Sequence, residues 1–180
     1  MKIDFTSRKQ EIDKILPKMI SVSQEFINYQ FVIAAVNNFN ISYYKKFIST
    51  GINNIDIVYN QTYDLLEISS AALVTSGTAT LEAAILKVPQ VVCYKTDLIS
   101  YYLIKFFIRI KFISLVNILL NKEVVKELIQ YDLNKNNLIS SLNNILDNKI
   151  RGEMINQYDY IIDQLAEKDS TINIVDFICK

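Results

Sequence analysis

A chain of 180 residues is long enough for one domain with a sizeable core, and 51% hydrophobic and 21% charged residues are typical of a globular protein. Nineteen basic and nineteen acidic side chains cancel, which argues against broad electrostatic capture of nucleic acid. The chain has no histidine, and its two cysteines, Cys93 and Cys179, are far apart, so we expect no metal site and no cofactor. This cysteine usage fits a reducing compartment.

Neither a signal peptide nor a membrane-spanning segment is expected. Charged residues interrupt the start of the chain, and the longest uncharged stretch, 26–44, carries several Asn and Gln side chains that would be costly in hydrocarbon. We therefore expect a cytoplasmic protein.

Short apolar runs alternate with helical periodicity along the first 94 residues. Buried strands are predicted at 3–6, 31–36, 55–59, 71–75 and 90–94. Helices are predicted at 12–27, 41–48, 62–69 and 79–86, with Pro17 expected to kink the first helix or delay its start. Strands that alternate with helices imply right-handed crossovers, so the fold class is α/β, with a Rossmann-like parallel sheet and flanking helices.

The second half differs in character. An extended run at 113–116 is expected to precede helices at 122–129, 135–146, 151–166 and 171–178. The sequence shows no clear interdomain linker, so residues 1–180 are interpreted as one domain, in which 151–180 forms a helical C-terminal segment.

Residues 75–82, Thr-Ser-Gly-Thr-Ala-Thr-Leu-Glu, lie between a predicted strand and a predicted helix. Small residues let a backbone approach a ligand, and the N–H groups of a first helical turn favour phosphate. The other interpretation is an ordinary capped turn, and the local chemistry leaves both open. Thr6, Ser7 and Arg8 similarly precede a helix. Arg8 could grip a diphosphate, although lone arginines are more often solvated.

Glu123 and Glu127 are four residues apart and, on a predicted helix, would share one face, with Gln130 following. They could bind ribose hydroxyls or simply form a solvated face beside lysines. Residues 101–112, YYLIKFFIRIKF, insert Lys105, Arg109 and Lys111 among aromatic side chains. This pattern suits an anionic membrane surface, and equally a core helix with a basic edge.

Taken together, four segments resemble lipid-A-disaccharide synthases. Residues 7–12 are similar to the family's Gly-Ser-Arg-x-x-Glu-Ile motif, and residues 73–82 with 88–95 are similar to its Ser-Gly-Thr-Ala-Thr-Leu-Glu strand–turn–helix and the strand after it. Residues 114–119 and 123–130 are similar to its Pro-Asn-x-(Leu/Ile) segment and the acidic helix after it. Their order and spacing match across nearly the whole chain.

The resemblance implies the C-terminal, nucleotide-sugar-binding half of a GT-B glycosyltransferase. Such an enzyme transfers a diacylglucosaminyl group from UDP-2,3-diacylglucosamine to 2,3-diacylglucosamine 1-phosphate and releases UDP, in the lipid A pathway of the Gram-negative outer membrane. It needs no metal and works peripherally on the inner face of the inner membrane. The UDP-binding residues implied are Ser7, Arg8, Ser76, Gly77, Thr78, Asn117, Glu123, Glu127 and Gln130.

The chain departs from the family pattern at Thr6, where Gly is usual, and at Val116, where many members have Pro. A full synthase is about twice as long, so the acceptor site and the catalytic base are expected on a separate or missing N-terminal half, onto which residues 151–180 would pack. Two alternatives stay open, a non-catalytic UDP-binding remnant and a UDP-GlcNAc 2-epimerase-like enzyme.

Overall fold

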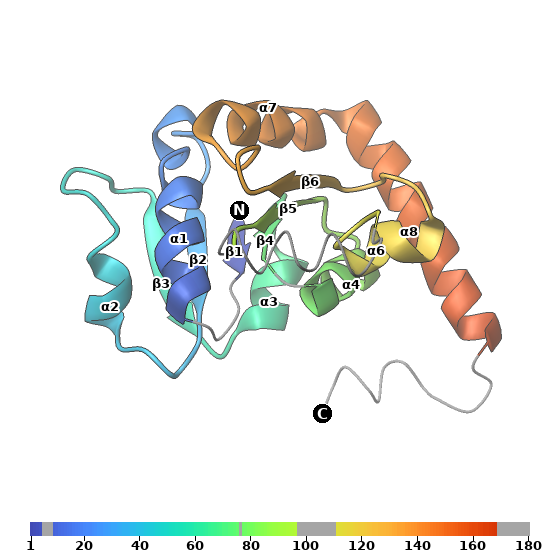
Figure 1. Cartoon of the computed structure of the whole chain (residues 1–180), viewed down its shortest axis with the longest axis horizontal. Helices are drawn as coiled ribbons and strands as arrows, with labels where there is room; N and C mark the ends of the chain where they lie inside the picture. The colour runs from blue at the N-terminus through green and yellow to red at the C-terminus, as the bar shows by residue number, and fades with distance from the viewer. Residues whose placement is uncertain (5–8, 76, 97–110, 169–180) are drawn as a thin grey trace.

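The computed structural model describes residues 1–4, 9–75, 77–96 and 111–168. Its centre is a six-stranded sheet in the order β3-β2-β1-β4-β5-β6, and every neighbouring pair is parallel (Figure 1). The strands are β1 (Lys2–Asp4), β2 (Phe31–Ala35), β3 (Ile55–Tyr59), β4 (Ala72–Val74), β5 (Gln90–Tyr94) and β6 (Lys126–Ile129). The α/β Rossmann-like prediction is confirmed.

The strand order reverses between β1 and β4. The chain first moves outward from β1 to β3, then returns to the other side of β1 and moves outward again to β6. In open parallel sheets, ligands bind outside the carboxyl ends of the strands at such a reversal. A ligand site is therefore expected among the segments that follow β1, β4, β5 and β6.

Helices connect the strands and cover the sheet. They are α1 (Lys9–Ile20), α2 (Ile41–Lys45), α3 (Thr62–Glu67), α4 (Gly77–Ile85), α6 (Leu115–Leu120), α7 (Lys135–Leu146) and α8 (Asn148–Lys168), with a short 3-10 helix at Ser23–Glu25. Contacts join α1 to α7, and α8 contacts α4, α6 and α7. Helices α4 and α6 also contact each other, so the elements that follow β4 and β5 lie side by side.

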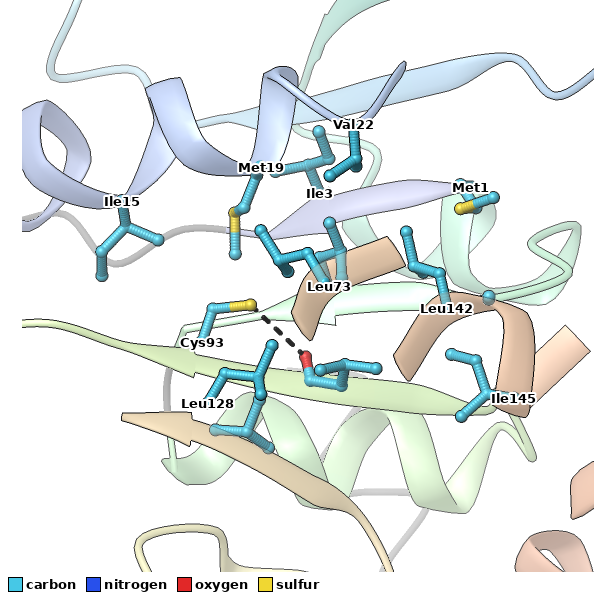
Figure 2. Packing of buried hydrophobic residues seen from close by; sticks show 14 of the residues in the cluster. Met1, Ile3, Ile15, Met19, Val22, Leu73, Cys93, Leu128, Leu142 and Ile145 are labelled. Carbon is cyan, nitrogen blue, oxygen red and sulfur yellow. Dashed lines mark hydrogen bonds between the residues drawn. The ribbon is translucent and has the colours of Figure 1, made fainter. Parts of the chain in front are cut away.

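The pleat of the strands divides the core. Ile3 and Leu73 point toward α1 and α7, together with Cys93, which is fully buried as expected for a core residue (Figure 2). Ala72 and Val74, the neighbours of Leu73 in β4, belong to a second cluster with residues of α3 and α4. Alternate residues of one strand thus face opposite layers, which is the period-two geometry of a sheet covered on both sides.

Helix α1 shows how the sequence pattern becomes packing. Ile12, Ile15, Leu16 and Met19 follow the helical spacing and are all 0% exposed. The helix begins at Lys9, three residues before the predicted start, and continues through Pro17 to Ile20; the prediction that it reaches residue 27 is wrong, because a short 3-10 helix follows at Ser23–Glu25. Pro17 therefore does not delay the start of the helix.

Two predicted elements between 113 and 129 are wrong. The run expected to be extended at 113–116 contains the start of α6, which Ser114 caps by accepting a hydrogen bond from the Asn117 N–H. Asn121 ends this helix in the left-handed conformation, with φ 49°, and the residues expected to form a helix then pair with β5 as strand β6. A short apolar run fits either a helix or a strand, and here the pairing with β5 at the edge of the sheet makes residues 126–129 a strand.

The predicted C-terminal helix begins at Asn148, and its described residues pack on this domain. Met154, Tyr158 and Ile161 are buried, Arg151 donates to the Ser70 carbonyl, and Lys87 pairs with Asp159 at 2.7 Å. The predicted helix at 171–178 lies outside the described residues. Within the described part of the chain, no helix combines the length and apolar character needed to cross a bilayer.

Candidate functional site

The start of α4 follows β4 directly, at the carboxyl edge of the sheet. Gly77 and Thr78 form its first turn, where the backbone comes close to another segment: a Cβ on Gly77 would lie 3.5 Å from the Ile113 carbonyl oxygen. One turn further, the Thr80 hydroxyl donates to the Gly77 carbonyl at 2.5 Å and accepts the Leu115 N–H at 3.2 Å. These contacts join the start of α4 to the start of α6.

A buried carboxylate lies at the start of α6. Glu127, 8% exposed, comes from β6, and the next residue, Leu128, packs in the hydrophobic core (Figure 2). Its two oxygens accept the N–H groups of Ile113 and Ser114, both at 2.9 Å. Negative charge at a helix start is stabilised by the helix dipole and by these N–H groups.

Asn117 completes this arrangement from within α6. Its side chain is 0% exposed; its Nδ2 donates to Glu127 at 2.9 Å and to the Val125 carbonyl at 2.8 Å. Its Oδ1 accepts the N–H groups of Val124 at 2.7 Å and Val125 at 2.9 Å. Asn117 therefore holds the chain where it leaves α6 and enters β6.

Gln130 follows β6 at the carboxyl edge, beside β5. Its N–H donates to the Tyr94 carbonyl at 2.9 Å, and its φ of 53° is left-handed, a conformation that costs a non-glycine residue about 1 kcal/mol or more. The side chain is 5% exposed, and its Nε2 has no hydrogen-bond partner in the protein. A strained backbone and an unsatisfied buried donor are features for which a bound ligand offers an explanation.

The other predicted residues lie elsewhere. Glu123 is not on a helix with Glu127; it is half exposed and pairs with Lys126 at 3.0 Å. It lines two neighbouring cavities, of about 490 and 430 Å³, at the outer side of β6 toward the start of α8. Lys111 is exposed, with its ammonium 5.0 Å from the Phe112 ring centroid. The remaining predicted residues, Ser7, Arg8, Ser76, Lys105 and Arg109, fall outside the described residues.

Sequence reasoning missed a second group of buried polar contacts. Gln90, at the start of β5, donates from Nε2 to the Thr80 carbonyl at 2.8 Å and to the Tyr158 hydroxyl at 3.3 Å. Burial raises the pKa of Tyr158, so this hydroxyl stays protonated. The signal available in the sequence was a polar residue heading the apolar strand QVVCY. Within the described ranges, no cluster of acidic residues or cysteines could hold a metal ion.

Comparison with known proteins identifies the family. The family model described as lipid-A-disaccharide synthetase matches residues 2–173. The chain belongs to this family.

Curated relatives agree with this membership. The chain is similar to lipid-A-disaccharide synthase 1 of Legionella pneumophila (strain Lens), 28% identical over 177 residues, covering 96% of this chain and 46% of the relative. It is 33% identical over 164 residues to the synthase of Psychromonas ingrahamii, covering 84% of this chain and 41% of the relative. The synthase of Saccharophagus degradans is 30% identical over 181 residues, covering 96% and 47%. The chain thus spans less than half the length of these relatives.

Solved structures support the fold. UDP-GlcNAc 2-epimerase from Neisseria meningitidis, bound to UDP-GlcNAc, superposes with a TM-score of 0.57 at 17% identity, over 92% of this chain and 44% of that protein. A putative UDP-N-acetylglucosamine 2-epimerase from Listeria monocytogenes gives 0.57 at 15% identity, over 96% and 45%. At these identities the likeness concerns the fold alone.

Proposed function

We propose that this domain is the donor-binding half of a lipid-A-disaccharide synthase and binds the nucleotide part of UDP-2,3-diacylglucosamine. The observation that carries the proposal is the family match over residues 2–173. The matched region includes the segments that follow β1, β4 and β6. Because the sheet is parallel, these three strands end at the same carboxyl edge. This is the edge at which nucleotides bind in open α/β folds.

The donor's diphosphate would lie at the start of α4. The N–H groups of a first helical turn have no partner within their own helix and favour phosphate. Gly77, together with Ser76 and Thr78, would let the backbone approach the phosphates, while Ser7 and Arg8 would contact them from the segment after β1. Gln130 would direct its unsatisfied Nε2 to the nucleotide. Glu123 is left out, because it is half exposed and paired with Lys126.

The proposed reaction joins the donor sugar to 2,3-diacylglucosamine 1-phosphate. The acceptor's 6-hydroxyl oxygen bonds to the sugar C1 as the C1–O bond to the diphosphate breaks, and UDP takes the bonding electrons. An arginine and helix-start N–H groups stabilise the charge that builds on this leaving group. The base that takes the hydroxyl proton is proposed to belong to a separate N-terminal half, since this chain spans less than half the length of its relatives.

We propose that the protein acts at an anionic membrane surface, the cytoplasmic face of the inner membrane. On α6, Ile118 is 45% and Leu119 51% exposed, and Lys111 and Lys122 are exposed at either end of this helix. Exposed apolar residues flanked by cations suit a lipid headgroup region. Co-sedimentation with vesicles containing phosphatidylglycerol, but not with neutral vesicles, is expected. Equal recovery with both would contradict the electrostatic part of the proposal.

Calorimetric titration of the chain with UDP tests the donor site. Saturable binding is expected, and Arg8→Ala should weaken it by roughly tenfold or more, the scale of a lost charge-assisted hydrogen bond. Lys149→Ala, on the exposed start of α8, is the control and should bind as the wild type does. A folded chain that binds no UDP contradicts the proposal that this half holds the nucleotide by itself.

Binding alone does not separate a donor half from a UDP-binding remnant. Disaccharide formation from the two lipid substrates, measured with and without a separately expressed N-terminal half of a relative, distinguishes them. Transfer that appears only with both halves supports the donor-half proposal. Epimerisation of UDP-GlcNAc by the chain in the absence of lipid would instead favour an epimerase-like activity.

A further inference from the structure

The first N–H groups of α6 are largely taken up by the protein itself. A helix start leaves N–H groups without intrahelical partners. Here Ile113 and Ser114 donate to Glu127, Leu115 donates to the Thr80 hydroxyl, and Asn117 donates to the Ser114 hydroxyl. The Glu127 carboxylate therefore occupies the place that a bound anion would take at the start of this helix.

The hydrogen-bonding groups of the Asn117 side chain are likewise all used within the protein. A side-chain amide offers two donor hydrogens and two acceptor lone pairs. All four are used by Val124, Val125 and Glu127, and the side chain has no exposed surface. A ligand could contact this amide only by displacing one of these buried hydrogen bonds.

These bonds fix the backbone next to the proposed diphosphate site. The carboxylate holds Ile113 through its N–H, and the carbonyl of the same residue lies 3.5 Å from the position of a Gly77 Cβ. Thr80 ties the next residues to the first turn of α4. Loss of the carboxylate would release the segment at 113–114 from β6 and so change the surroundings of Gly77.

We propose that Glu127 and Asn117 are positioning residues, which hold the segment at 113–114 against the start of α4 and make no contact with the nucleotide. This inference rests on the proposed UDP site, because it assigns the pair a role in shaping that site. It differs from the ribose-binding role that the sequence allowed for Glu127.

A comparison of two ligands separates the roles. UDP and its 2′,3′-dideoxy analogue differ only in the ribose hydroxyls, so we titrate both into wild type and Glu127→Gln. If the pair positions the backbone, the variant should lose affinity for both ligands by the same factor, roughly tenfold. If Glu127 accepted a hydrogen bond from the ribose, the loss should be large for UDP and nearly absent for the analogue, and this result would overturn the inference.

Amide hydrogen exchange, followed by NMR without ligand, gives an independent readout. Glu127→Gln should speed exchange at Ile113 and Ser114 by roughly tenfold or more, while Leu73 in β4 keeps its protection. Glu153→Gln, an exposed carboxylate on α8, is the matched control and should change neither amide. Unchanged exchange at Ile113 and Ser114 in Glu127→Gln would refute the positioning role.

The two proposals can fail separately. If wild type binds neither ligand, the donor-site proposal fails, and the exchange experiment still decides whether Glu127 holds the segment. If Glu127→Gln does not fold, Glu127→Asp replaces it in both experiments, since it keeps the charge with a shorter reach. It should speed exchange at the same two amides and weaken both ligands equally, and a loss confined to UDP would overturn the inference.

Discussion

Replacement of Asn117 by alanine is expected to destabilise the domain strongly. It leaves the N–H groups of Val124 and Val125 and the carbonyl of Val125 without their side-chain partner, and it removes one of three donors to Glu127. A buried polar group left unsatisfied costs about 1–3 kcal/mol. Three such main-chain groups imply a loss of about 3 kcal/mol or more, a large share of the 5–15 kcal/mol that is typical of a folded domain.

Urea unfolding followed by far-UV circular dichroism measures this loss. The midpoint should fall by about 1–3 M if the slope is in the usual range of 1–3 kcal/mol per M and unchanged by the substitution. Asn143→Ala, an exposed position in α7, is the control and should change the free energy of unfolding by less than about 0.5 kcal/mol. A loss below about 1 kcal/mol for Asn117→Ala would show that water or a neighbour replaces its hydrogen bonds, and would refute the reasoning.

Three further substitutions or reactions probe the same region and the core. In Gly77→Ala the new Cβ meets only an ordinary contact at 3.5 Å, so the melting temperature should be unchanged or higher while calorimetry shows weaker UDP binding; unchanged binding would mean that the phosphates do not approach this backbone. Tyr158→Phe removes one of the two acceptors of the Gln90 amide and should lower the free energy of unfolding in urea by about 1 kcal/mol, whereas a stabilised variant would contradict this expectation. Burial raises the pKa of the Cys93 thiol, so iodoacetamide should label it only after unfolding; peptide mapping that finds native labelling would disprove this.

Most of the sheet was predictable because β2, β4 and β5 are short, mainly apolar runs. Residues 55–59 and 90–94 were predicted with the bounds that the structure has, and so was the helix at 135–146. The segment at 113–129 was not, because its apolar residues suit a helix or a strand. The left-handed turn at Asn121 ends the helix, and pairing with β5 makes the following residues a strand; both features depend on tertiary structure.

The candidate site divides in the same way. The sequence named Asn117 and Glu127 as one group, and the structure brings them to 2.9 Å from each other. It could not predict that both side chains turn inward to backbone groups of their own domain, since that direction follows from the strand identity of residues 126–129. The roles of Thr80 and Gln90 depend on contacts between elements far apart in the chain, for which local patterns carry no signal.

The place of β1 in the middle of the sheet has a consequence for folding. Its partners on either side are β2, about thirty residues later, and β4, about seventy residues later, so neither is a local neighbour. Closing such long loops costs entropy before any contact repays it, and parallel pairing of distant strands slows folding. On a ribosome, the edge of β1 that pairs with β4 would stay unpaired until residues 72–74 had emerged. A strand that lies inside the folded sheet would thus spend part of synthesis with an open edge, and it is there that a chaperone is expected to bind the nascent chain.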